Sequence, residues 1–168
     1  MTEDEFWAIV ERSRGGGVGL DPDMLNQLSV VVHGLSDQEL LAFDGHFRAA
    51  RDRAYSWDLW AAGYLIQGGM SDDGFEDFRS WLIAHGRDIY VRALAEPDSM
   101  VDLTWRPDLE DMGLAEFYAS VAVEEMGRRG LSAPYDPGPQ DPSGAPFPED
   151  DDEWFSQRFP RLWARLSG

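Results

Sequence analysis

The sequence predicts an all-α protein of about six to eight helices. Apolar residues recur at helical spacing along most of the chain, as in "EDEFWAIVERS". Helix-capping residues precede several of these stretches, and no run shows the pattern of a strand. Because 168 residues with 43% hydrophobic content are enough for one core, we expect a single helical domain over residues 1–131.

The first helices begin at recognisable capping residues. Thr2 with Glu5 and Ser36 with Glu39 form capping-box patterns, in which each side chain accepts a backbone N–H of the other residue. The second capping box precedes a long apolar stretch up to Gly69. This stretch is either one long helix or two helices joined near residues 54–56.

Another helix start lies between these two capping boxes. Asp21 is a good N-cap, and Pro22 suits the first helical position. The glycine-rich segment before it, residues 15–19, follows a helix and has no P-loop lysine. We therefore expect a flexible loop there and no nucleotide site.

The segment "SDDGFEDFRSWLIAHG" is predicted to be one helix. Ser71 is the expected N-cap, and Gly86 is expected to end the helix as a left-handed C-cap. The residues expected to face the core are Phe75, Phe78, Trp81, Leu82 and His85.

Two further helices follow. One begins at Arg87 and stops before Pro97, and the next ends at Gly130. In the latter we expect Phe117, Val121 and residues 123–126 to face the core.

The last part of the chain has a different composition. Residues 132–153 are rich in proline and acids, which predicts an irregular arm. Residues 154–168 carry two Trp, two Phe and two Leu, so we expect a short C-terminal helix that packs on the main domain through Trp154 and Trp163.

The charge composition limits the partners. The formal net charge is −18, which disfavours nucleic acids and anionic membranes, so we expect a protein or a cationic ligand as the partner. No apolar run is long enough to span a membrane, and the N-terminal stretch is acidic and amphipathic, so we expect a cytoplasmic protein. The composition leaves the oligomeric state open.

Several kinds of chemistry are missing from the composition. All 14 basic residues are arginine, so no lysine can form a Schiff base, and no cysteine is present. The three histidines are far apart, so we expect neither a transition metal nor a cofactor.

One neighbourhood combines residues that could form a site. The carboxylates that could bind a hard cation or act as general acid and base are Asp72, Asp73, Glu76 and Asp77. Arg79 could clamp a carboxylate or a phosphate. The structural alternatives are favoured: acids are common in a first helical turn, and Arg79 could pair with a neighbouring helix such as the one that carries Asp58.

An aromatic stripe precedes this neighbourhood. Trp57, Trp60 and Tyr64 recur at helical spacing and could line a pocket for a cationic group. Such a stripe is more often part of the core.

The chain resembles DUF4240, a bacterial family of proteins of unknown function, through the segments "EDEFWAIVERSR", "LWAAGYLIQGG", "SDDGFEDFRSWLI" and "AEFYASVAVEEM". The resemblance covers roughly residues 3 to 128. It implies no catalytic role for any residue, although some relatives adjoin domains named for a Trp-Gly-Arg motif.

These observations favour a non-catalytic protein-interaction or regulatory module with an acidic surface. The alternative is a small enzyme or ligand-binding protein that uses a carboxylate, arginine and aromatic cleft around residues 57–81. Mimicry of nucleic acid by the acidic surface is a weaker third reading, because many arginines interrupt the acids. The second reading requires Asp77 and Arg79 to face solvent together.

Overall fold

The computed structural model of the protein describes residues 1–14, 20–103 and 109–167. Within these ranges it contains nine α-helices, one 3₁₀ helix and no β-strand, so the all-α prediction is confirmed. The glycine-rich loop expected at residues 15–19 lies outside the described residues. The helices are α1 (Glu3–Ser13), α2 (Pro22–His33), α3 (Asp37–Arg53), α4 (Trp57–Gln67), α5 (Asp72–Ala84), α6 (Arg87–Ala95), the 3₁₀ helix η1 (Pro97–Asp102), α7 (Leu109–Arg129), α8 (Asp152–Arg158) and α9 (Pro160–Leu166).

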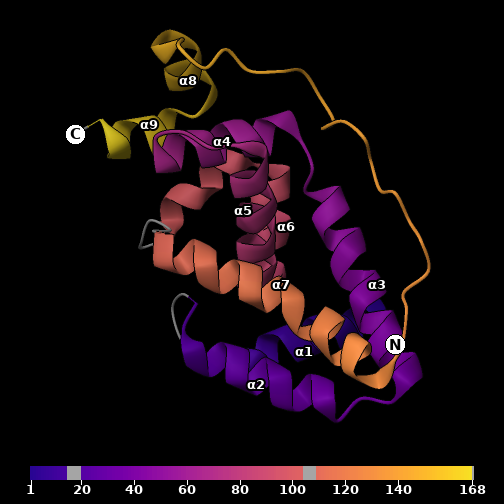
Figure 1. Ribbon diagram of the computed structural model, residues 1–168. Helices are drawn as coiled ribbons and strands as arrows, with labels where there is room; N and C mark the ends of the chain where they lie inside the picture. Colours follow the sequence, from indigo (N-terminus) through magenta and orange to yellow (C-terminus); the bar gives the residue numbers. More distant parts are fainter. Residues whose placement is uncertain (15–19, 104–108, 168) are drawn as a thin grey trace.

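Helix α5 lies at the centre of the arrangement (Figure 1). It packs against α3, α4, α6 and α7, and the long α7 also packs against α2 and α3. After α7 the chain runs as an irregular arm along the outside of the molecule and reaches α8 beyond α4 (Figure 1). The chain then returns to the helical body as α9, which packs against α4 and η1.

The predicted N-terminal caps are confirmed. Thr2 and Glu5 form a capping box at α1, and Ser36 and Glu39 form another at α3. The side chain of Asp21 accepts the backbone N–H of Met24 at the start of α2. Each cap satisfies a backbone donor that has no partner inside its helix.

The cap of α5 leads to a first prediction. The Ser71 hydroxyl oxygen accepts the N–H of Gly74 at 3.2 Å, and Asp72 and Asp73 occupy the first turn as expected. Ser71→Ala should lower the free energy of unfolding by about 1 kcal/mol in urea denaturation, because this N–H loses its partner. Ser71→Asn, which restores a capping oxygen, should recover most of the loss. An alanine variant as stable as the wild type would contradict the prediction.

The stretch after Ser36 forms two helices, which settles the alternative left open by the sequence. Helix α3 ends at Arg53, and Ser56 caps α4 by accepting the N–H of Leu59 at 3.2 Å. The described residues contain more helices than the predicted six to eight. The additional ones arise because α3 and α4 are separate, because the C-terminal segment forms both α8 and α9, and because η1 was not predicted.

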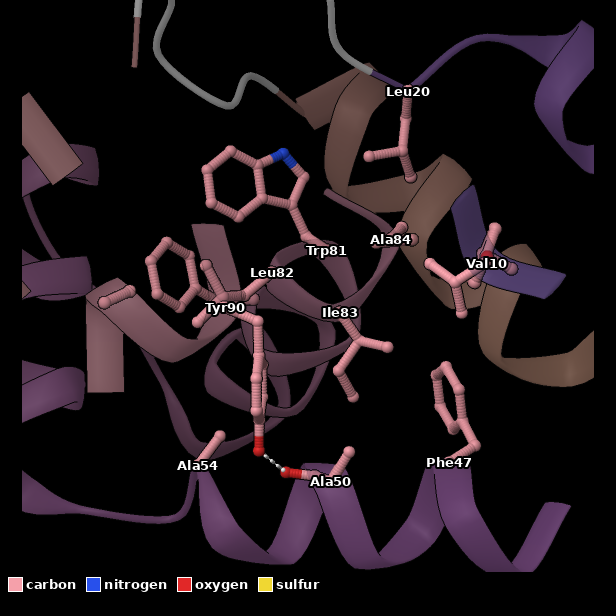
Figure 2. Packing of buried hydrophobic residues seen from close by; sticks show 14 of the residues in the cluster. Val10, Leu20, Phe47, Ala50, Ala54, Trp81, Leu82, Ile83, Ala84 and Tyr90 are labelled. Carbon is pink, nitrogen blue, oxygen red and sulfur yellow. Dashed lines mark hydrogen bonds between the residues drawn. The ribbon is translucent and has the colours of Figure 1, made fainter. Parts of the chain in front are cut away.

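The core surrounds the C-terminal half of α5 (Figure 2). Phe75, Phe78, Trp81 and Leu82 are all fully buried, as predicted. Tyr90 from α6 crosses this core, and its hydroxyl donates to the backbone carbonyl of Ala50 on α3 at 2.7 Å (Figure 2). The only polar atom of this side chain is therefore satisfied inside the core.

Gly86 differs from the prediction of a left-handed C-cap. Its φ is +89°, but its ψ of 168° lies outside the left-handed helical region, and the residue is the N-cap of α6. His85, in right-handed conformation, ends α5. A Cβ at Gly86 would lie 2.1 Å from Oε1 of Glu11, so glycine permits the close approach of α1 to the turn between α5 and α6.

The buried face of α7 also differs from the prediction. Phe117 and Val123 are 59% and 55% exposed, whereas Tyr118 is buried and its hydroxyl lies 3.1 Å from that of Ser13. The residues that face the core are Ala115, Tyr118, Ala122 and Met126, of which Met126 was predicted. Val121, also predicted, is partly buried and packs against the core. The prediction assumed that the large apolar residues of α7 face the core. Instead, α7 packs closely through alanines and one hydrogen-bonded tyrosine.

The C-terminal segment forms two short helices where one was predicted. Phe159 separates α8 from α9 with φ −129° and ψ 64°, since the residue before a proline avoids the helical region. Phe155, Phe159 and Leu162 are buried against the rest of the chain. The carboxylate of Asp98 in η1 accepts the N–H groups of Arg161 and Leu162 at 3.1 and 2.9 Å.

Candidate functional site

The aromatic stripe on α4 is covered by other parts of the chain. Trp57 stacks on Trp60 with ring centroids 5.1 Å apart, and Trp60 stacks on Phe75 at 4.9 Å. Phe147 from the arm lies edge-on against Trp57 at 6.1 Å and against Tyr64 at 5.4 Å. The rings of the stripe are therefore in contact with Phe75 and Phe147 and do not form an open cage for a cation.

Arg79 is buried and serves the fold. Its exposed fraction is 8%, and its guanidinium donates to the carbonyls of Phe75 at 3.3 Å and of Arg51 at 3.1 Å. The guanidinium also lies over the ring of Tyr55, 4.5 Å from its centroid. Burial and the nearby Arg51 lower the pKa of Arg79. Arg79 thus joins α3 to α5 and is not available to clamp an anion.

The prediction that Arg79 pairs with the helix that carries Asp58 is wrong. Asp58 pairs with Arg158 of α8. The tertiary structure brings α8 beside α4, so an arginine 100 residues away in sequence takes this position.

The predicted carboxylates lie near Glu116, an acid that the sequence analysis did not single out. Asp77 is partly buried on α5, and Glu116 of α7 lies close enough to disfavour its charge. Burial is the largest cause of the raised pKa of Asp77, followed by Glu116, Glu76 and Asp73. Asp73, Glu76, Asp77 and Glu116 form what we call the α5–α7 acidic patch. Asp72 is exposed in the same first turn.

An arginine of α3 lies beside the acidic patch. Arg51 of α3 pairs with Glu76 at 2.6 Å and lowers the pKa of Asp77 slightly against the acids. Within the described ranges Asp73, Asp77 and Glu116 form no ion pair. The ligand-binding alternative requires Asp77 and Arg79 to face solvent together, but Arg79 is buried and only Asp77 is partly exposed.

The acidic patch predicts a pH-dependent effect of Asp77→Asn. The raised folded-state pKa means that the protonated form of Asp77 stabilises the fold below the ordinary value of 3.8, and that this stabilisation is lost as the pH rises through the folded pKa. At about pH 7 the asparagine variant should therefore unfold at higher urea concentration than the wild type. At about pH 3 the difference should disappear, because both side chains are then neutral.

Asp72→Asn is the matched control for this measurement. Asp72 is exposed in the first turn, where the helix dipole favours its charge, so its variant should gain nothing at neutral pH. An equal gain in both variants would show that net charge, and not the crowding at Asp77, is responsible.

Each of the three histidines has a different neighbour. His46 Nε2 lies 3.1 Å from the carbonyl of Met1, and His85 Nδ1 donates to the carbonyl of Trp81 at 2.7 Å. His33 lies beside Glu125 and Arg128. In the part of the chain that the structure describes, no three His, Asp or Glu side chains are grouped to hold a metal ion.

A cleft of about 370 Å³ lies between α1 and α6, away from the predicted neighbourhood. Trp7 and Tyr90 line it together with Arg53 and Arg87. Both arginines are already paired, Arg53 with Glu3 at 2.8 Å and Arg87 with Asp4 at 2.6 Å. The cleft therefore offers no free cation for a catalytic or anion-binding role.

Comparison with known proteins supports the resemblance found in the sequence. A family model described as "Protein of unknown function (DUF4240)" matches residues 1–127. No curated protein and no solved structure matches the chain. Every helix in the described ranges is too short or too polar to span a bilayer. Because the family model matches well over half of its length, the chain belongs to the DUF4240 family of proteins of unknown function.

Proposed function

We propose that this protein is a non-catalytic interaction module that binds a positively charged segment of a cytoplasmic protein at the α5–α7 acidic patch. The carrying observation is that Asp77 of α5 is partly buried, with Asp73 on its own helix and Glu116 of α7 close by. Burial first, and then repulsion by the charges of Glu116, Glu76 and Asp73, raise the pKa of Asp77. A Lys- or Arg-rich segment would relieve this repulsion. Binding would thus gain free energy that the isolated chain lacks.

The use of the arginines supports a cationic partner. Ten arginines in the described ranges form ion pairs with carboxylates of the same chain. Arg79 and Arg165 donate instead to backbone carbonyls. Most of the positive charge is therefore engaged internally, while 32 acids give the chain its net charge of −18.

Apolar side chains beside the acidic patch supply a second component of binding. Phe117 follows Glu116 directly, and Val123 lies two turns further along the same side of α7 as Glu116. Both are more than half exposed. Protein interfaces combine such apolar anchors with charged rims, so the proposed partner is a basic segment with an apolar face.

The second reading, a small enzyme or ligand-binding protein around residues 57–81, has less support. It requires Arg79 and the aromatic stripe to be open to a ligand. Arg79 is buried, and Phe147 covers Trp57 and Tyr64.

The test uses a fluorescein-labelled basic amphipathic peptide as the probe, with binding followed by fluorescence anisotropy. The wild type should bind it with an affinity that falls as salt increases. The triple variant Asp73→Asn, Asp77→Asn, Glu116→Gln should bind at least about tenfold more weakly, because several charge contacts are lost together.

A second triple variant controls for net charge. Asp136→Asn, Asp141→Asn and Glu149→Gln remove the same number of charges from exposed positions on the arm. This control should bind the peptide within about twofold of the wild type. Equal weakening of both variants, or no binding by the wild type, would reject the acidic patch as the site.

A further inference from the structure

The arm is fastened to α4 by a short segment, residues 143–147, which we call the strap. At its start, the N–H of Trp57 donates to the carbonyl of Ser143 at 2.9 Å, and the N–H of Ser143 donates to the carbonyl of Tyr55 at 3.0 Å. These two bonds form an isolated parallel bridge between Ser56 and Ser143. The backbone before α4 thus receives an extended segment as a sheet edge receives a strand.

The other end of the strap inserts an aromatic ring. Phe147, between Pro146 and Pro148, lies edge-on to Trp57 and Tyr64 of α4, with centroids 6.1 and 5.4 Å away. It also lies edge-on to Phe155 of α8 at 5.9 Å. Edge-to-face contacts of this kind favour an aromatic ring over an aliphatic side chain of similar size.

The same arm contains a similar segment whose aromatic side chain does not dock. Tyr135 follows Ala133 and Pro134, as Phe147 follows Ala145 and Pro146, yet Tyr135 is 91% exposed. The segment that lies between Tyr135 and the strap makes local hydrogen bonds, such as the one that the N–H of Gly138 donates to the carboxylate of Asp136. The docking of Phe147 is therefore specific to the surface it meets and is not a general property of the arm.

The surface and its occupant also differ in their relation to the family. Residues 55–64, which form the surface, lie within the family match, whereas the strap lies outside it. The surface thus belongs to the part of the chain that identifies the family, and the strap does not.

We propose that the backbone of residues 55–57 and the rings of Trp57 and Tyr64 form a recognition surface for an extended, proline-flanked aromatic segment of a partner protein. The strap occupies this surface in the isolated chain and competes with the partner. The prolines of such a ligand reduce the entropy lost when it binds in extended form. This site is separate from the α5–α7 acidic patch and does not depend on the function proposed for that patch.

The test uses the full-length chain and a fluorescein-labelled peptide of residues 141–150, "DPSGAPFPED". In the wild type the tethered strap has a high effective concentration and should exclude the peptide. The Phe147→Ala chain should bind the peptide at least about tenfold more tightly, because its own strap no longer fills the surface. Circular dichroism of the variant checks that it is folded.

Two controls make the outcome specific. Tyr135→Ala removes an exposed aromatic from the same arm and should behave as the wild type does. A peptide with alanine in place of phenylalanine should not bind the Phe147→Ala chain. If Phe147→Ala unfolds, Ser143→Pro, which removes the N–H that donates to Tyr55, replaces it in the assay.

Three results would overturn the proposal. The first is equal binding of the peptide to the wild type and the variant, and the second is absence of binding to a folded variant. The third is self-association of the wild type that the peptide disperses, since the occupant would then be a second copy of the chain and not a different protein.

Discussion

Trp81→Ala should lower the free energy of unfolding by roughly 3 to 5 kcal/mol. Trp81 is fully buried near the middle of the core, and its ring stacks on Phe78 with centroids 5.2 Å apart. Its ring also lies 4.4 Å from that of His85. Removing the indole leaves a large cavity that helices packed on several sides cannot fill by a small shift.

Urea denaturation at neutral pH measures this loss, and Phe117→Ala is the matched control. Phe117 is also a large aromatic residue on a helix, but it is 59% exposed, so its variant should lose less than about 1 kcal/mol. The expected loss for Trp81→Ala also exceeds the loss of about 1 kcal/mol expected for Ser71→Ala. Comparable midpoints for Trp81→Ala and Ser71→Ala would contradict the importance assigned to this part of the core.

Deleting residues 149–168 should lower the melting temperature by at least several degrees. The deletion removes Phe155, Phe159 and Leu162, which are at most 3% exposed, and each such side chain contributes roughly 1.5 to 3 kcal/mol before the cost of ordering the segment. It also leaves the carboxylate of Asp98 without the two N–H groups of α9. For a chain of this size, 1 kcal/mol corresponds to about 2 to 4 °C in melting temperature.

Phe159→Ala in the full-length chain tests the same contribution without truncation. Phe159 is fully buried, so this variant should also melt at a lower temperature. An unchanged melting curve for the deletion, together with loss of a dimer or partner on a sizing column, would instead identify the tail as an element that binds another chain.

The starts of the helices follow from residues that are close in sequence. Thr2, Asp21, Ser36 and Ser71 cap their helices as predicted, because an N-cap bonds to a backbone N–H only a few residues away. The apolar spacing of α5 likewise predicted the burial of Phe75, Phe78, Trp81 and Leu82, which recur at the period of a helix.

The buried face of α7 depended on its neighbours. Its sequence offers more than one apolar side, and the side that packs is the one whose alanines let α7 approach closely and whose Tyr118 meets Ser13. Nothing within α7 itself distinguishes this side from the one that exposes Phe117. Burial at such positions depends on long-range contacts, which local periodicity does not contain.

The candidate sites also combine features that the sequence predicts with features that depend on long-range contacts. From the sequence alone it was possible to identify the acids at the start of α5, the single arginine among its aromatics and the aromatic stripe of α4. Only the tertiary structure placed Glu116 beside Asp77, gave Arg79 the carbonyl of Arg51, and laid Phe147 over Trp57 and Tyr64. Each of these contacts joins residues distant in sequence, and its energy depends on burial and on distance, which are properties of the packed helices and not of any one segment.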